Sequence, residues 1–160
     1  MSNQSIQITV DDAEINAALN NLMRHINNLQ PAMNSIGEAL VGLIQEHLGR
    51  GETPWGDPFE PLSAAYIKAV PRRAGGIPLN DTHQHLFNRI NAQSGSDYVE
   101  VGLLDHPDTP GLALAHQFGS DRNGLPARPY LPLRNGQVDL PQDWADEVLA
   151  MIEVHLQSGH

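Results

Sequence analysis

The sequence predicts an α+β fold in which long N-terminal helices and a C-terminal helix pack on a small, mainly antiparallel sheet, with long proline-rich loops between them. Apolar residues recur at helical spacing over residues 12–48 and 140–156. Apolar and polar residues alternate over the short stretches 5–10 and 98–104, which is typical of half-buried strands. Prolines gather between residues 49 and 78, where regular structure is therefore expected to be sparse.

The N-terminal part is predicted to contain a strand at 5–10, followed by helices at 12–29 and 32–48. Asp11 lies three residues before Glu14, the spacing of a capping box that starts a helix. Pro31 has no backbone N–H to donate within a helix, so the helix before it breaks or kinks. This region therefore forms two helices or one helix with a kink. The Gly49-Arg50-Gly51 sequence is typical of a glycine C-cap and ends the second helix.

Farther along, a short helix is predicted at 62–70 and another at 112–118. Residues 87–93 and 98–104 are predicted to pair as a hairpin, with Ser94-Gly95-Ser96 as the turn. The last helix, at 140–156, has a second capping-box spacing from Asp139 to Gln142, and Trp144 begins its apolar face. We expect one domain that covers residues 1–160.

The composition excludes several classes of protein. The chain of 160 residues has a net charge of −10 and only nine Lys+Arg, so it lacks the dense positive charge that sequence-independent DNA binding needs. No dedicated or sequence-specific nucleic-acid partner is therefore expected. It has no cysteine, which excludes disulfides, thiolate zinc sites and cysteine nucleophiles. Neither a signal peptide nor an apolar run long enough to span a membrane is visible, so we expect no membrane contact and a soluble protein made in a cytoplasm.

Catalytic patterns are weak. His83 and His85 follow Asp81, and two imidazoles at this spacing converge on a metal ion only if the segment is extended. Polar loop histidines are the favoured interpretation, and a small metal-dependent enzyme that uses His83 and His85 is the alternative. No nucleophile motif or phosphate-binding loop is present, so no cofactor is expected and the chain is not predicted to be an enzyme.

Four segments, in this order, resemble the phage virion morphogenesis family, the tail-completion proteins of Mu-like and related phages. The fourth segment is the most specific, because it matches the family pattern from Ala115 to Gly119 and again from Pro126 to Leu131. Trp55 precedes Gly56, whereas the family usually has the tryptophan after the glycine. The segments are IGEALVGLIQEHL, TPWGDPFEPLSAAYIKA, GGIPLNDTHQHLFNRI and LALAHQFGSDRNGLPARPYLPL.

The resemblance implies a non-enzymatic virion protein that completes the tail and supports head–tail joining. The implied partners are tail tube and head-connector proteins, and the expected assembly is a homo-oligomeric ring, a hexamer if it follows the six-fold symmetry of tails. The protein would be assembled in the bacterial host cytoplasm and reside in the virion, encoded by a phage or prophage. A regulatory, antitoxin-like interaction protein is a weaker alternative, suggested by the acidity and helix content.

Seven residues are candidates for an interface. His116, Gln117 and Phe118 are expected to form a packing corner, with Phe118 buried and Gln117 bound to backbone groups, in preference to a direct partner contact. Gly119 is expected to adopt a left-handed conformation there. We call residues 124–132 (GLPARPYLP) the arm, and we expect Arg128 in it to pair with a carboxylate of its own chain or of a neighbour. Tyr130 in the arm is a further candidate. The last two are Trp55 and Phe59, and for these two a contact with a partner or another subunit is favoured over a role in the core.

Overall fold

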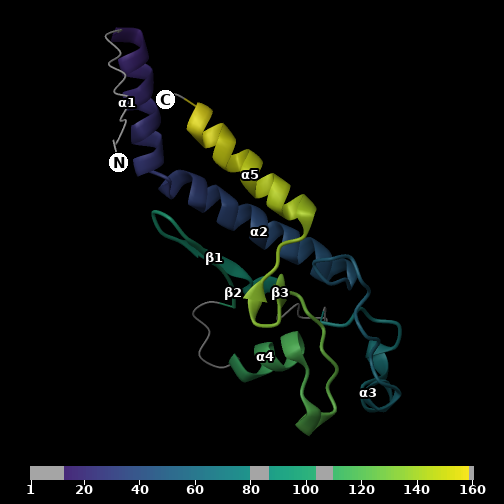
Figure 1. Ribbon diagram of the computed structural model, residues 1–160. Helices are drawn as coiled ribbons and strands as arrows, with labels where there is room; N and C mark the ends of the chain where they lie inside the picture. The colour runs from purple at the N-terminus through teal and green to yellow at the C-terminus, as the bar shows by residue number, and fades with distance from the viewer. Residues whose placement is uncertain (1–12, 80–86, 104–109, 159–160) are drawn as a thin grey trace, which may run out of the picture.

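The computed structural model describes residues 13–79, 87–103 and 110–158, and it confirms the predicted α+β arrangement (Figure 1). The predicted strand at 5–10 lies outside these residues. The helices and strands are α1 (Ala13–Asn27), α2 (Gln30–Arg50), α3 (Ala64–Ala69), β1 (Asn91–Ser94), β2 (Val99–Gly102), α4 (Pro110–Phe118), β3 (Leu133–Arg134), β4 (Gln137–Val138) and α5 (Gln142–Gln157). Three short 3-10 helices are η1 (Pro71–Arg73), η2 (Phe87–Arg89) and η3 (Asp121–Asn123).

The two N-terminal helices are separate. Pro31 lies in the first turn of α2, where its missing N–H would have no helical partner in any case. At the other end of α2, Gly51 adopts a left-handed conformation with φ 72°, as the predicted C-cap requires. A Cβ atom at Gly51 would also lie 2.8 Å from Cγ2 of Ile77, so both the backbone and the available space favour glycine there.

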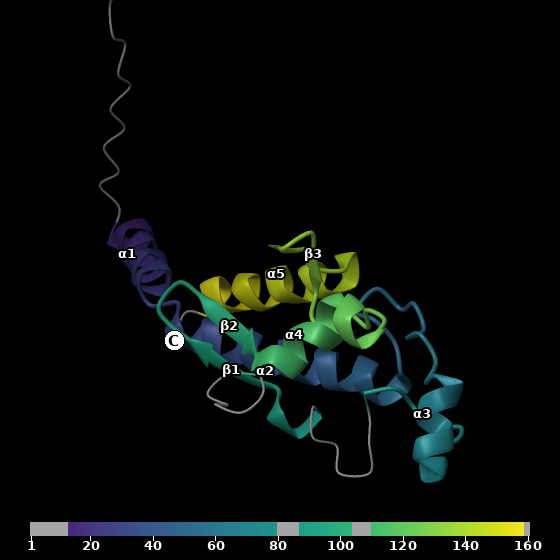
Figure 2. The same cartoon turned by 90° about the horizontal axis from the view of Figure 1, so that it is seen from below.

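Helix α2 is the central element. It packs against α5 on one side and against the β1–β2 hairpin on the other, while α1 contacts α5 (Figures 1 and 2). A Cβ atom at Gly37 would lie 3.0 Å from Cβ of Ala92, so this glycine lets the hairpin approach the helix closely. None of the helices in the described ranges is long and apolar enough to cross a bilayer.

The predicted hairpin forms, but its strands are shorter than expected. They pair antiparallel from Asn91 opposite Gly102 to Ser94 opposite Val99. Residues 87–89 were predicted as strand and instead form η2. Continuing the register would place them opposite residues 104–106, which lie outside the described residues. Within the described part η2 packs against α2, and Ile90, between η2 and β1, belongs to the core.

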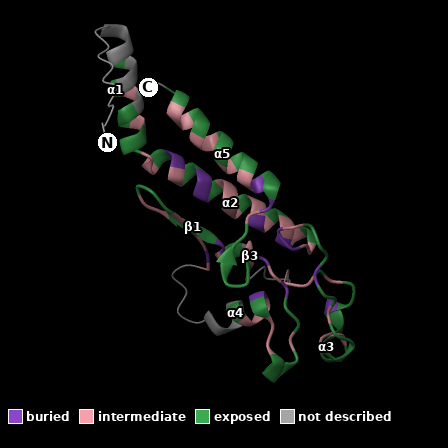
Figure 3. Cartoon of the chain, in the orientation of Figure 1, coloured by how far each residue is buried: buried purple, intermediate pink, exposed green. Residues whose placement is uncertain are grey.

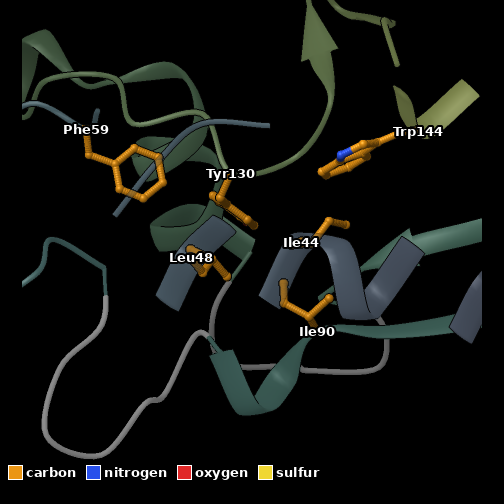
Figure 4. Packing of buried hydrophobic residues seen from close by; sticks show 6 residues of the cluster. All are labelled: Ile44, Leu48, Phe59, Ile90, Tyr130 and Trp144. Carbon is orange, nitrogen blue, oxygen red and sulfur yellow. The ribbon is translucent and has the colours of Figure 1, made fainter. Parts of the chain in front are cut away.

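Distant parts of the chain meet in one core (Figures 3 and 4). Trp144 of α5 has an exposed fraction of 0%, which confirms the prediction that it is buried. Its ring lies 5.4 Å from the His47 ring, measured between centroids. The six core residues are Ile44 and Leu48 of α2, Phe59 of the following loop, Ile90 before β1, Tyr130 of the arm, and Trp144.

Sequence reasoning missed the small β3–β4 hairpin. Asn135 and Gly136 form its turn with φ values of 52° and 75°, both left-handed as a type I′ turn requires. The predicted capping box before α5 is wrong, because α5 begins after Pro141 without a side-chain cap. Asp139 instead pairs with Arg134 of the hairpin at 3.4 Å.

Candidate functional site

The arm is tied to the end of α4 by one side chain. Gln117 is buried, and its Oε1 accepts hydrogen bonds from the backbone N–H groups of Tyr130 at 3.1 Å and Leu131 at 2.9 Å. Its Nε2 donates to the carbonyl of Leu131 at 3.1 Å. The side-chain amide thus supplies hydrogen bonds to the backbone of the arm that a neighbouring strand would otherwise provide. The expectation that Gln117 satisfies backbone groups is confirmed.

A second side chain ties the arm to the loop that follows α2. Arg128 is buried, and its Nε donates to the carbonyl of Glu60 at 2.6 Å while Nη2 donates to that of Pro61 at 2.8 Å. It forms no ion pair with any described residue, so the expected carboxylate of its own chain is corrected to two backbone carbonyls. A carboxylate of a neighbouring subunit stays a prediction. These carbonyls lie in irregular chain and need a donor once they are covered. We call Gln117, Arg128 and the backbone groups that they bind the arm joint.

His116 lies beside this joint. Its carbonyl accepts a hydrogen bond from the backbone N–H of Arg128 at 2.7 Å, while its buried Nδ1 makes no hydrogen bond within the described part of the chain. Burial, and secondly the charge of Arg128, lower the pKa of His116 below its ordinary value of 6.5. Burial also lowers the pKa of Arg128, and the Glu60 carboxylate acts in the opposite sense. The folded joint therefore favours a neutral imidazole beside a buried cation.

The corner that ends α4 is partly as predicted. Gly119 has a left-handed φ of 78°, and a Cβ there would lie 3.0 Å from both the nitrogen of Ala127 and the carbonyl oxygen of Leu125. Phe118 was expected to be buried and is instead 51% exposed. Gln117 points toward the arm, and adjacent helical residues point about 100° apart, so Phe118 is turned toward solvent.

The aromatic candidates separate into two groups. Phe59 and Tyr130 belong to the core of their own chain, so the preference for a partner contact at Phe59 is corrected. Burial raises the pKa of Tyr130 to about 12. Trp55 is half-buried beneath Arg134, whose guanidinium carbon lies 3.8 Å from the ring centroid. A partner contact at Trp55, His116 or Phe118 stays a prediction.

Asp81, His83 and His85 lie outside the described residues, so the metal hypothesis stays a prediction from the sequence. Among the residues that the structure describes, no group of three or more His, Cys, Asp or Glu side chains is placed to hold a metal ion. The polar atoms of the joint bind backbone groups of the same chain. The joint therefore holds separate segments of the chain together. The sequence signals for this role were an amide, Gln117, before a glycine turn and an arginine, Arg128, in a proline-rich segment.

The phage virion morphogenesis family matches residues 10–157, a range that includes the helices, the core and the whole arm joint. No curated protein matches the chain significantly, and no solved structure does either. The family match spans nearly the full chain, and it includes the segment in which the sequence signature was most specific. The chain therefore belongs to the phage virion morphogenesis family.

Proposed function

We propose that this protein is a non-enzymatic virion component that completes the phage tail and supports the joining of head and tail, as tail-completion proteins of Mu-like phages do. The observation that carries the proposal is the family match over residues 10–157. The arm joint supports a structural role, because Gln117 and Arg128 hold loops of their own chain together. A rigid loop scaffold is what a docking protein needs, since ordering loops beforehand lowers the entropic cost of binding.

The charge of the chain suits a position next to the path of DNA. The net charge of −10 repels phosphate, so DNA could slide past without adhering. Helix α5 has four acidic residues and neither lysine nor arginine. The proposed assembly is a homo-oligomeric ring, with six subunits in keeping with the symmetry of tails, in contact with tail tube and head-connector proteins. It forms in the host cytoplasm and stays in the virion.

The test is deletion of the coding sequence from the phage or prophage genome, followed by electron microscopy of the lysate. We expect filled heads and separate tails to accumulate, and we expect plasmid-borne wild-type protein to restore joined particles. Mass spectrometry of purified particles should then detect the protein as a constituent. Normal yields of infectious particles after deletion, or absence of the protein from complemented particles, would contradict the proposal.

A further inference from the structure

Helix α3 is a regular element that the other described residues leave largely uncovered. None of its six residues is buried, and Tyr66 is 43% exposed although the helix sequence, AAYIKA, is mostly apolar. Its main described contacts are with η1, and it lies at the end of the molecule remote from α1 in both views (Figures 1 and 2). Ser63 caps it, with Oγ accepting from the N–H of Tyr66 at 3.1 Å. We call α3 and η1 the projecting segment.

The projecting segment is basic in an acidic protein. It contains three cations, Lys68, Arg72 and Arg73, and no acidic residue, whereas the whole chain has a net charge of −10. Lys68 and Arg72 are exposed, and neither forms an ion pair with a described residue. A surface that combines exposed apolar atoms with unpaired cations favours an acidic partner surface that also has apolar side chains.

The outer face of α5 has this character. The side of α5 opposite Trp144 exposes Asp146, Ala150 and Glu153, and Leu149 and Val154 beside them are 63% and 65% exposed. The two carboxylates accept hydrogen bonds from side-chain amides of the same helix, Asp146 from Gln142 at 2.8 Å and Glu153 from Gln157 at 3.0 Å. In the described part of the chain no lysine or arginine neutralises them.

We propose that the projecting segment of one copy docks on the outer face of α5 of a second copy. This inference rests on the proposed ring, and it names the two surfaces that meet in it. The surfaces have opposite charge, and both expose apolar side chains. They also occupy separate places on the chain (Figure 1). A contact between two different surfaces leaves one of each free on every dimer, so subunits add head to tail until a ring closes.

The absence of cysteine permits a disulfide trap. Ala65→Cys places a thiol on α3, and Ala150→Cys places one at the centre of the outer face of α5. We expect oxidation of the mixed variants to give much more mixed dimer than a control pair of Ala65→Cys with Ser35→Cys, which lies on an exposed part of α2. A yield equal to that of the control pair would overturn the proposal, because random collision alone produces it.

Charge-reversal substitutions in the cysteine variants test whether opposite charges hold the two surfaces together. Lys68→Glu/Arg72→Glu, combined with Ala65→Cys, should lower the mixed-dimer yield about fivefold, as expected for two exposed ion pairs. Asp146→Lys/Glu153→Lys, combined with Ala150→Cys, should do the same against the unreversed partner. Mixing the two reversed proteins should restore the yield, because opposite charges face each other again. Loss without restoration would overturn the proposal.

The outcomes also separate this inference from the proposed function. A failed trap together with unjoined heads and tails after gene deletion would refute the α3–α5 contact and leave the function intact. A successful trap with normal particles after deletion would support the α3–α5 contact and refute the proposed function. Charge reversals that lower particle yield without changing the trap would assign the surface to a different partner and overturn the proposal.

Discussion

The arm joint and the projecting segment are both built from proline-flanked chain, yet they differ in what surrounds their cations. Arg128 is buried and bonded to two carbonyls of its own chain, whereas Lys68 and Arg72 are exposed and without an ion pair among the described residues. The two aromatic residues among prolines in the Trp55–Phe59 loop predicted a contact surface, but Phe59 belongs to the core. A proline-rich composition alone therefore does not identify a docking surface. The difference lies in the exposure of the cations. Arg73 of the projecting segment is also buried and donates to the carbonyl of Ile77 at 2.8 Å, so Lys68 and Arg72 are the two cations of this segment that a partner can reach.

The largest effect should come from the core on which the joint rests. Trp144→Ala is expected to lower the free energy of unfolding by about 3–5 kcal/mol, because a fully buried indole leaves a large cavity. Trp144→Phe is the matched control and should cost less, since its ring fills part of the space. Chemical denaturation measures both. An unchanged midpoint for Trp144→Ala would show that α5 is not docked on α2.

The second largest effect on the free energy of unfolding should come from the arm joint itself. Arg128→Met keeps the length of the side chain but removes two hydrogen bonds from a charged donor, which is expected to cost about 2–5 kcal/mol. Arg128→Lys, which keeps the charge without the planar fork, should lie between wild type and Arg128→Met. Arg128→Glu should cost more than Arg128→Met, because a carboxylate would then face the carbonyls of Glu60 and Pro61. Variants that melt like wild type would mean that Arg128 faces a partner and not its own loop.

Acid should weaken the joint through His116. Its pKa is lowered in the folded protein, so the unfolded chain binds a proton more readily. Stability is therefore fully present above the unfolded pKa of about 6.5 and falls as the pH drops toward the folded pKa. We expect the melting temperature to fall more between about pH 7.5 and about pH 5 in wild type than in His116→Gln. An equal fall in both proteins would contradict this.

The smallest effect on stability should come from the projecting segment. Tyr66→Ala and Lys68→Ala remove exposed side chains, so each is expected to change the free energy of unfolding by less than about 0.5 kcal/mol. Thermal melts of both variants check this. A larger loss would mean that α3 is held by the body of its own chain, and the contrast with the joint would disappear.

Periodic and punctuating residues made the helices predictable from the sequence. The apolar spacing, Pro31 and Gly51 define α1 and α2 because these signals act within a few residues. The hairpin was predicted, but its extent was not, since strand length depends on a partner elsewhere in the chain. The β3–β4 turn was predictable, because Asn135-Gly136 is a strong local signal for a type I′ turn.

The site was less predictable, because its contacts are long-range. The role of Gln117 followed from an amide at the end of a helix before a glycine turn. The partners of Arg128 lie 67 and 68 residues away and are backbone carbonyls, which no side-chain pattern reveals. The orientation of Phe118 depends on the helical phase that Gln117 sets. The exposure of α3 was equally hidden, because its short apolar sequence also fits a buried helix.

The most direct test of the account is particle joining by charge-swapped variants in a phage that lacks the wild-type gene. Lys68→Glu/Arg72→Glu should melt like wild type yet leave heads and tails separate in electron micrographs. The same chain that also contains Asp146→Lys/Glu153→Lys should restore joined particles, because each projecting segment again meets an opposite charge on its neighbour. Normal joining with the first variant, or failure of the folded fourfold variant to restore it, would contradict the account.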